Sequence, residues 1–414
     1  MSESKGSAIA LVGGRLIDGT GSAPVPNATV LVDGDKIQQA GPAGQVQVPA
    51  GADRIDVTGK TLMPGLIDAH VHLLGIKSMN QMTWLIDEPH LRTIRAAVDA
   101  WRCLDAGFTT LRDAGGMMAI YAKQAIEEGP VPGPWIVTSG RVISQTAGHG
   151  DWHFVPVEWN ERMQLGRLAD GVPEVRKAAR EQLREGADML KIFTTGGVMS
   201  EKDKPTTCQY SMDEIRAFVE EAHNAGVRTG SHAQGTQGIK NAVLAGVDNI
   251  DHGIYLDDEV IELMVERGTT LLPTLAVVDA IVRHGREDGV LESSVRKAER
   301  VQVAHIESFR NAFAAGVTCG LGTDYLSAPT SPMGANADEL LMYVNKVGLS
   351  PMEAIVCATR NNALVLGLQD KIGTLEAGKQ ADLIVVDGDP LADISVLRNR
   401  ENIVVVYKGG EAIP

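Results

Sequence analysis

The sequence predicts an α/β fold, in which a (β/α)₈ TIM barrel is joined to a small β-sandwich domain built from both chain termini. Two observations lead to this prediction. Short apolar runs alternate with amphipathic helical stretches through the middle of the 414-residue chain. Both ends instead contain short apolar runs separated by Gly, Asp and Pro, and we expect them to pair in space. We therefore assign 1–63 and 368–414 to the β-sandwich and 64–367 to the barrel.

Eight apolar runs in the middle of the chain are typical of buried parallel strands. They are 65–69, 109–111, 135–137, 189–192, 227–231, 249–251, 270–272 and 317–321. Helical stretches fall between them, such as 211–225, where Ser211 and Glu214 have the spacing of a capping box. This alternation fits a barrel, and a doubly wound open sheet is the alternative for the same pattern.

The charge of the chain limits its partners. Lys and Arg number 38 against 53 Asp and Glu, which gives a net charge of −15. Nucleic acids and anionic membranes both attract basic surfaces, so we expect neither as a partner. No apolar run reaches the roughly 18 residues that span a bilayer, and 1–8 contain no apolar signal core. The four cysteines form no CxxC pair, which fits a reduced, cytoplasmic setting.

Histidines fall where predicted strands end. His70 and His72 follow the first barrel run, and alternate residues of a strand share a face, so both imidazoles can point to one centre. His232, His252 and Asp324 each lie at the C-terminal end of a later run. In a barrel these ends converge on one mouth. Nitrogen and oxygen ligands gathered there would suit Zn²⁺ or a similar divalent ion.

Lys191 interrupts an apolar run that should be a buried strand. Burying an ammonium group is costly, so such a lysine needs a partner or a lowered pKa. A neutral amine can react with CO₂, and the two oxygens of the resulting carbamate could bridge two cations. The alternative is a lysine that snorkels to the barrel rim or pairs with an acid such as Asp188.

Taken together, these residues resemble the amidohydrolase superfamily over essentially the whole chain. The similar pieces are 34–37, 64–72, Lys191, His232, His252, Asp324 and 373–383, in that order. The resemblance implies that His70, His72 and Asp324 bind one metal ion. It also implies that a carboxylated Lys191 bridges to a second ion, which His232 and His252 hold. Asp324 would then take a proton from the water between the ions and pass it to the leaving nitrogen.

Three further runs, 109–116, 139–151 and 209–211, resemble the branch of imidazolonepropionase-like amidohydrolases and metal-dependent Xaa-Pro dipeptidases and carboxypeptidases. This branch implies that His149 and Tyr210 face the substrate, where either could donate a hydrogen bond to the developing oxyanion. The alternatives are a surface loop position for His149 and a packing role at a helix start for Tyr210.

The expected function is a binuclear metal-dependent hydrolase that cleaves a C–N bond through a metal-bridging hydroxide. Its substrate is amide-like: an N-acyl amino acid, dipeptide, aryl amide, carbamate or urea. Zn²⁺ is the expected metal, although Mn²⁺ and Co²⁺ share these ligands. Because relatives self-associate, we also expect a homo-oligomer. The alternative is an imidazolone-type cyclic amide hydrolase or a deaminase, but 232–235 lack the glutamate that such deaminases carry after the fifth strand.

Two departures from peptide-cleaving relatives bear on the substrate. The run 152–154 is Trp-His-Phe where those relatives carry a Cys-rich, Arg-containing stretch, and 332–334 are Pro-Met-Gly instead of Pro-His-Gly. A pocket near Trp84, Trp152, Phe154 and Met333 would favour an apolar or aromatic group. We therefore expect an enzyme of class EC 3.5 rather than EC 3.4.

Overall fold

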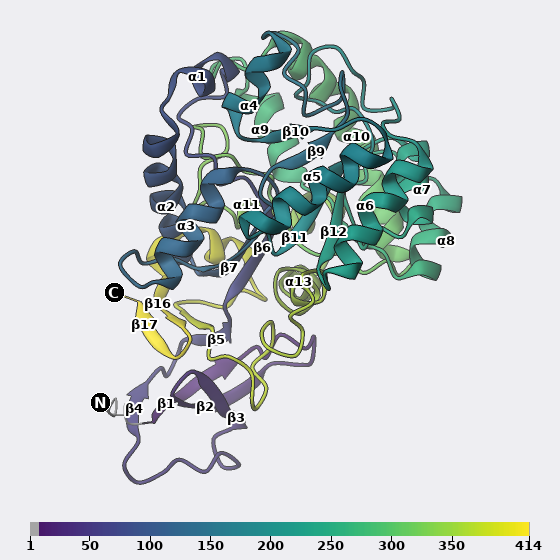
Figure 1. Ribbon diagram of the computed structural model, residues 1–414. Coiled ribbons are helices and arrows are strands. Elements are labelled where there is room, and N and C mark those ends of the chain that lie inside the picture. The colour runs from purple at the N-terminus through teal and green to yellow at the C-terminus, as the bar shows by residue number, and fades with distance from the viewer. Residues whose placement is uncertain (1–7, 414) are drawn as a thin grey trace. The chain divides into compact units, whose positions relative to one another are not determined.

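The computed structural model describes residues 8–413, so the ends of the predicted β-sandwich domain at 1–7 and 414 lie outside the described residues. The chain divides into two compact units. Among the described residues, the first comprises 8–67, Arg102–Thr110 and 334–413, and the second comprises Asp68–Trp101 and Leu111–Met333. Figure 1 labels the helices and strands.

Both ends of the chain enter one eight-stranded sheet in the first unit, with the order β17-β16-β15-β5-β1-β2-β3 and β4 beside β1. The strands are β1 (Ile9–Leu16), β2 (Val25–Asp33), β3 (Lys36–Pro42), β4 (Asp53–Asp56), β5 (Thr61–Pro64), β15 (Leu383–Val386), β16 (Ile403–Lys408) and β17 (Glu411–Ile413). Antiparallel pairing of β5 with β15 joins the N-terminal and C-terminal strands, which confirms that the two ends pair.

The apolar side chains of this sheet share one core. Leu11, Val30 and Ile37 from the N-terminal strands pack in the same buried cluster as Leu383 and Tyr407 from the C-terminal strands. Such mutual burial is what stabilises a sheet with an apolar inner face. The remaining elements of the unit are short helices: α11 (Asp338–Met342), η2 (Tyr343–Val347), α12 (Pro351–Val356), η3 (Cys357–Asn361), α13 (Asn362–Leu366), η4 (Ile394–Arg398) and η5 (Arg400–Asn402).

Parallel strands form the centre of the alternating part of the chain. One sheet has the order β6-β7-β8 and another has the order β10-β9-β11-β12-β13-β14. Their bounds are β6 (Leu66–Val71), β7 (Phe108–Asp113), β8 (Trp135–Thr138), β9 (Val142–Ser144), β10 (Gly166–Leu168), β11 (Met189–Phe193), β12 (Arg228–Ala233), β13 (Asn249–His252) and β14 (Thr270–Leu272). Seven of the eight predicted runs fall on these strands, whereas β9 and β10 were not predicted.

The eighth predicted run, 317–321, contains no regular strand but hydrogen-bonds like one. Leu271 N donates to Thr318 O at 3.0 Å, and Gly320 N donates to Leu271 O at 2.9 Å. On the other side, Ala69 N donates to Leu321 O at 2.9 Å. The segment therefore lies between β14 and β6, and it carries the backbone directly to Asp324.

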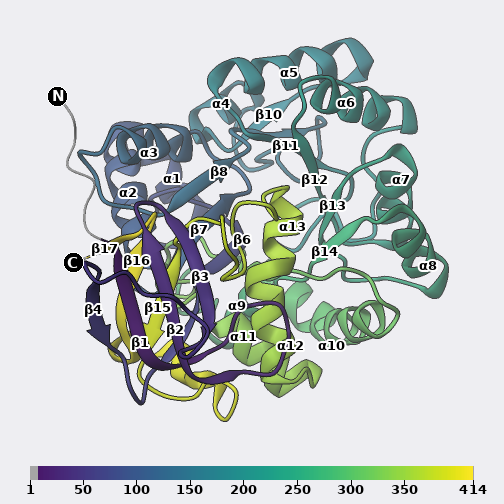
Figure 2. The same ribbon diagram turned by 90° about the horizontal axis from the view of Figure 1, so that it is seen from below.

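Helices cover the outer side of the parallel strands in Figures 1 and 2, where α5 to α8 lie outside β11 to β13. The helices are α1 (Gln81–Ile86), α2 (Pro89–Asp105), α3 (Met117–Glu127), α4 (Asn160–Met163), α5 (Gly171–Glu185), α6 (Met212–Asn224), α7 (Thr236–Ala245), α8 (Asp258–Arg267), α9 (Leu275–His284) and α10 (Glu292–Ala314), with a 3₁₀ turn η1 (Val157–Trp159). The predicted capping box of Ser211 and Glu214 is present at the start of α6.

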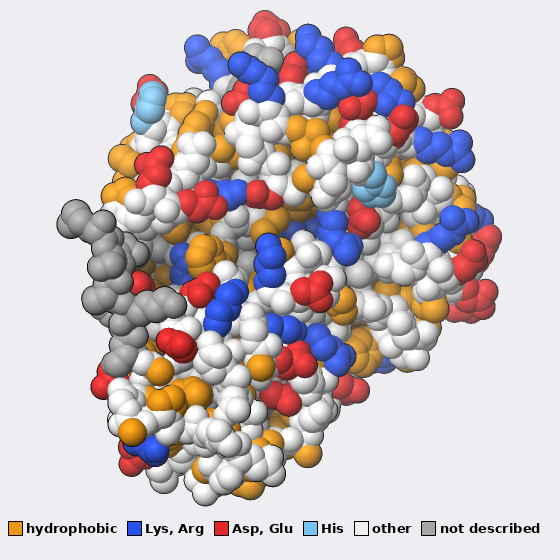
Figure 3. All heavy atoms as spheres, turned by 60° about the horizontal axis from the view of Figure 1, so that its bottom comes forward, with side chains coloured by type: hydrophobic (Ala, Val, Ile, Leu, Met, Phe, Trp, Pro, Cys, Tyr) orange, Lys and Arg blue, Asp and Glu red, His pale blue; other side chains and the backbone are white. Residues whose placement is uncertain are grey.

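Acidic and basic side chains are interspersed on the face of the molecule in Figure 3. Ion pairs on the surface include Arg286 with Glu292 at 2.9 Å. Such exposed pairs contribute at most about 1 kcal/mol each to stability, so burial rather than surface charge holds the fold. Within residues 8–413, no helix combines the length and apolar character that a membrane crossing requires.

Candidate active site

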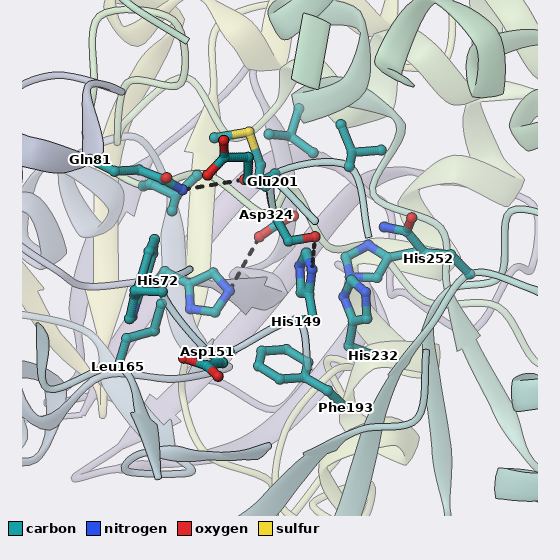
Figure 4. A pocket seen from close by; sticks show the side chains of 18 of the residues that line it. His72, Gln81, His149, Asp151, Leu165, Phe193, Glu201, His232, His252 and Asp324 are labelled. Atoms are coloured by element: carbon teal, nitrogen blue, oxygen red, sulfur yellow. Dashed lines mark hydrogen bonds and ion pairs between the residues drawn. The ribbon is translucent and has the colours of Figure 1, made fainter. Parts of the chain in front are cut away.

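One cavity, lined by residues of the second unit, contains all six predicted metal ligands and His149. Figure 4 labels four of these ligands, His72, His232, His252 and Asp324, together with His149. His70 belongs to β6, and His72 follows directly after it. His232 and His252 lie near the ends of β12 and β13, and Asp324 follows the segment that bonds to β6. The ligands reach one place because parallel strands end on the same side.

The nearest predicted ligands are within reach of a shared ion. Ligand atoms of His70, His252 and Asp324 all lie within 4.8 Å of one another. Asp324 Oδ1 is 3.4 Å from His70 Nε2 and 3.3 Å from His72 Nε2. The His232 ring lies 4.5 Å from the His252 ring, centroid to centroid. Imidazole and carboxylate groups at these separations form a donor set that suits a divalent ion such as Zn²⁺.

Each of the four imidazoles has one ring nitrogen beside a protein oxygen. The pairs are His72 Nδ1 with Gly115 O at 2.9 Å, His252 Nδ1 with Thr274 Oγ1 at 2.7 Å, His232 Nε2 with Gly196 O at 3.2 Å, and His70 Nδ1 with a carboxylate oxygen of Asp251 at 3.2 Å. The hydrogen bonds of His72, His252 and His232 fix the ring orientation and leave the opposite nitrogen for a metal. The residues present therefore fit the metal centre that the sequence implies.

The protonation states of His70, His232, His252 and Asp324 agree with this fit, whereas for His72 the hydrogen bond and charge of Asp324 outweigh burial and raise the pKa. Burial lowers the pKa of His70 to about 3 and holds the pKa values of His232 and His252 well below their ordinary range. Burial opposes ionisation of Asp324, but hydrogen bonds from His70 and His72 nevertheless hold its pKa well below the ordinary value. Neutral imidazoles and an ionised carboxylate are the forms that bind metals.

Lys191 is buried in β11, with 1% of its side chain exposed, and its Nζ contacts the carboxylate of Asp251. Arg112 Nη2 lies 2.6 Å from the same carboxylate. Burial and the Arg112 charge hold the pKa of Lys191 well below its ordinary value, which favours the neutral amine. Lys191 therefore does not snorkel to a rim. It does not pair with Asp188 either, because Asp188 contacts Lys123.

Sequence reasoning missed Asp251 and Arg112 as part of this centre. Both are charged and 2% exposed or less. Arg112 follows the predicted run 109–111 and Asp251 ends the run 249–251, so position at the end of a predicted strand, the signal that singled out His232 and His252, could have found them. Two ligands also have unusual backbones: His252 has φ 75° and Asp324 has φ 57°, in the left-handed region that non-glycine residues rarely adopt.

His149 and Tyr210 differ in their placement. The ring of His149 lines the cavity and stacks on His232 with centroids 4.2 Å apart, so it is no mere surface loop residue. Tyr210 is buried, does not line the cavity, and its hydroxyl donates to Ala169 O at 2.9 Å. With its hydroxyl held there, the phenol does not line the cavity in this structure, and a substrate contact of Tyr210 stays a prediction.

Aromatic side chains form part of the cavity wall. Trp84 and Trp152 meet edge to face with centroids 5.4 Å apart, and Phe154 lies 6.0 Å from Trp152. Met333 is buried but does not line the cavity, so its predicted place in the pocket was wrong. Among the described lining residues there is no arginine, and Lys191 is the one lysine. The wall therefore favours an apolar group.

The sequence matches the model of the Amidohydrolase family over residues 61–413. It is 36% identical to ochratoxinase from Aspergillus niger, over 96% of this chain and 85% of that protein. It is 26% identical to imidazolonepropionase from Cereibacter sphaeroides, over 92% of this chain and 93% of that protein. These relatives lie in the branch that the sequence resembles.

Comparison with solved structures indicates the same family. A crystal structure of a prolidase complexed with N-methylphosphonate-L-proline has a TM-score of 0.91 at 36% identity, covering 98% of this chain and 99% of that one. The crystal structure of A. niger ochratoxinase also has a TM-score of 0.91, at 33% identity, covering 98% and 95%. The chain therefore belongs to the amidohydrolase family and is a hydrolase that acts on carbon–nitrogen bonds.

Proposed function

We propose that this protein is a binuclear metal-dependent amide hydrolase of class EC 3.5. The observation that carries the proposal is the joining, in one cavity, of four imidazoles with Asp324 and a buried lysine of lowered pKa. This combination offers more ligands than one tetrahedral ion needs.

In the proposed centre His70, His72 and Asp324 hold one ion, and His232 and His252 hold the other. Lys191, carboxylated on its amine, bridges the two. Zn²⁺ is the proposed metal, with Mn²⁺ and Co²⁺ as substitutes. Two such ions would supply a shared hydroxide as nucleophile and a Lewis acid for the carbonyl.

The residues of the chain have separate tasks in this proposal. Asp324 accepts the proton that the nucleophile releases and delivers it to the leaving nitrogen. Its carboxylate lies between His70 and His72, at 3.4 and 3.3 Å, so it is held where a proton can be exchanged with the cavity. The aromatic wall excludes water and orients the substrate.

We propose an amide with an apolar or aromatic group as substrate, such as an aryl amide, carbamate or phenylurea. The contacts among Trp84, Trp152 and Phe154 support this choice. The likeness to ochratoxinase supports it further, and we extend to this chain the kind of substrate that the name of that enzyme denotes. The absence of arginine from the described lining residues speaks against substrates that need a guanidinium to bind a free carboxylate.

Three broader features belong to the same proposal. We propose a closed barrel, supported by the bonds of 318–321 to both β14 and β6 and by Asp188 N donating to Thr138 O at 2.8 Å. We propose a homo-oligomer, supported by a group of exposed apolar side chains on α1 and α2: Met82, Ile86, Leu91, Ile94 and Val98. A cytoplasmic location stays a proposal, supported by four free cysteines.

The test is a hydrolysis screen with purified protein loaded with Zn²⁺, Mn²⁺ or Co²⁺, combined with metal analysis. The panel contains N-acyl amino acids, Xaa-Pro dipeptides, anilides, carbamates and phenylureas. We expect close to two ions per chain and the highest kcat/KM for aryl substrates. A chelator-treated sample is the control and should be inactive until metal is restored. Full activity in a preparation with no bound metal would contradict the proposal.

A further inference from the structure

The two tryptophans of the aromatic wall are held in different ways. Trp84 Nε1 donates to Ser78 O at 2.8 Å, so the indole of Trp84 is fixed by its own polar atom. Trp152 also lines the cavity and is 9% exposed, but its buried Nε1 has no hydrogen-bond partner among residues 8–413. Another group must therefore set the position of the Trp152 ring.

The side-chain amide of Asn160 binds the backbone that carries this ring. Asn160 Oδ1 accepts from Trp152 N at 2.7 Å. On the other end of the amide, Nδ2 donates to Asp151 Oδ1 at 2.8 Å and to Val157 O at 3.1 Å. Asn160 is 4% exposed, so water does not compete for these bonds. The amide of Asn160 therefore fixes the chain on both sides of Trp152.

These bonds allow the amide only one orientation. If it turned by half a rotation, Nδ2 would face the N–H of Trp152, and Oδ1 would face the carboxylate of Asp151 and the carbonyl of Val157. Buried polar groups that lose their partners are destabilising, so this orientation is disfavoured. Asp151 extends the network, because its Oδ2 accepts from Ala147 N at 2.8 Å. The loop before and after Trp152 is thus closed on Asn160.

Asn160 is itself held relative to Trp84. It is the first residue of α4, and Met163 is the last. Arg92, which is 1% exposed, donates from Nη1 to Trp84 O and Met163 O, both at 3.3 Å, and from Nε to Leu74 O at 3.0 Å. One buried guanidinium therefore joins α1, α4 and the segment after β6.

The ring contacts of Trp152 depend on this backbone position. Trp152 meets Trp84 edge to face at an interplanar angle of 77° and Phe154 at 75°. Such edge-to-face contacts are favourable only over a narrow range of separations. If the backbone at Trp152 moved, both contacts would change, and the apolar wall would lose its shape.

We propose that Asn160 is a positioning residue, which acts through Trp152 and determines the preference of the cavity for aromatic over aliphatic amides. The inference rests on the proposed function and deepens it. Asn160 does not line the cavity, so it reaches a substrate only through Trp152. It therefore affects the binding of the aromatic group, expressed in KM, and not the cleavage step, expressed in kcat.

The test compares acetanilide with N-ethylacetamide, which share an acetyl group and differ in the aromatic ring. Kinetics use zinc-loaded full-length protein, and calorimetry on the chelator-treated protein gives dissociation constants without turnover. We expect Asn160→Ala to raise KM and the dissociation constant for acetanilide about fivefold, the effect of one lost hydrogen bond, with kcat changed less than about twofold. The constants for N-ethylacetamide should change less than about twofold. Asn224→Ala, at the exposed end of α6, is the matched control and should change none of them.

A double-mutant cycle separates positioning from general damage. In a Trp152→Ala background, Asn160→Ala should change the dissociation constant of acetanilide less than about twofold, because the ring that it positions is gone. If Asn160→Ala does not fold, Asn160→Ser, which keeps a small polar group at this position, takes its place with the same expectations.

A loss of the same size in the Trp152→Ala background would overturn the inference. Equal losses for both amides would do so too, as would unchanged acetanilide binding in a variant that melts at the wild-type temperature. If the zinc-loaded wild type hydrolyses no amide but calorimetry gives the expected pattern, the proposed function fails and the positioning role stands. If the wild type hydrolyses both amides with equal KM, the inference fails and the proposed hydrolysis stands.

Discussion

Lys191 and Asp251 form an ion pair in which the side chains are 1% and 0% exposed. Arg112 contacts the same carboxylate, so two basic side chains and one acid share a dry interior. Removing one partner of such a group leaves an uncompensated buried charge, which typically costs about 3–5 kcal/mol. This energetically costly group lies at the position where the proposed centre needs an amine that can be carboxylated.

Replacement of Lys191 by Ala should abolish measurable hydrolysis, because the proposed bridge between the two ions is lost. Bicarbonate with a short carboxylic acid should restore part of the activity by supplying carboxylate oxygens. Lys240→Ala, which removes a surface lysine paired with Glu259, is the control and should retain full activity. Intact-mass analysis of the wild type under native conditions should show one added CO₂. Wild-type rates for Lys191→Ala would disprove the bridge.

Asp324→Asn should retain metal and lower kcat about a thousandfold, as expected when a general acid–base group is removed. The amide keeps an oxygen that can face a metal but cannot carry the proton. Metal analysis and kinetics on the same preparation separate the two roles. Near-normal turnover would remove Asp324 from proton transfer, and loss of one ion would identify it chiefly as a ligand.

Trp84→Ala should raise KM for aryl amides about tenfold and leave small aliphatic amides nearly unchanged, since the lost contact is aromatic area. Trp84 is 3% exposed and packs against Trp152 in the cavity wall. Trp159, which is 45% exposed and lies outside the cavity lining, offers the matched Trp→Ala control. A uniform rise in KM across both substrate classes would mean that Trp84 supports the site without contacting the substrate.

His305 should make stability depend on pH. Burial lowers its pKa to about 4, against about 6.5 in an unfolded chain. Between these values the unfolded chain binds more protons than the folded one, so the stability contribution is complete above pH 6.5 and falls as the pH drops towards 4. The loss approaches about 3 kcal/mol at the lower end.

Urea unfolding at pH 7.5 and 4.5 should therefore show a smaller pH dependence for His305→Gln than for the wild type. His90→Gln, at an exposed position of α2, should follow the wild type. If the free energy of unfolding fell by the same amount between pH 7.5 and 4.5 in all three proteins, His305 would not contribute to the loss of stability. The other buried histidines titrate in every variant, so their effect cancels in the comparison.

Local signals predicted much of the fold. Ser211 and Glu214 start α6 through contacts within four residues, and the apolar run 270–272 coincides with β14. Strands β9 and β10, which pair with each other, were not predicted. The run 317–321 pairs on both sides without regular strand geometry, which no local pattern indicates.

The residues of the candidate site likewise include some that a local sequence pattern predicted and some that it did not. His70, His72 and Lys191 were found because each has a residue type that conflicts with, or directly follows, an apolar strand. Asn160 gave no such signal, since its side chain meets the backbone of Trp152 only when the loop between them is folded. Tyr210 was assigned to the substrate by resemblance, but the direction of its hydroxyl depends on Ala169, 41 residues away.

The left-handed backbones of His252 and Asp324 limit how far this protein can be stabilised. A glycine would adopt φ 75° or 57° without strain, and each non-glycine residue there costs on the order of 1 kcal/mol. Procedures that improve thermostability by choosing the residue that best fits each backbone angle would therefore select glycine at both positions. Such a redesign would produce a more thermostable chain that lacks two of the proposed metal ligands. In directed evolution for heat resistance, these two positions should be held fixed from the start.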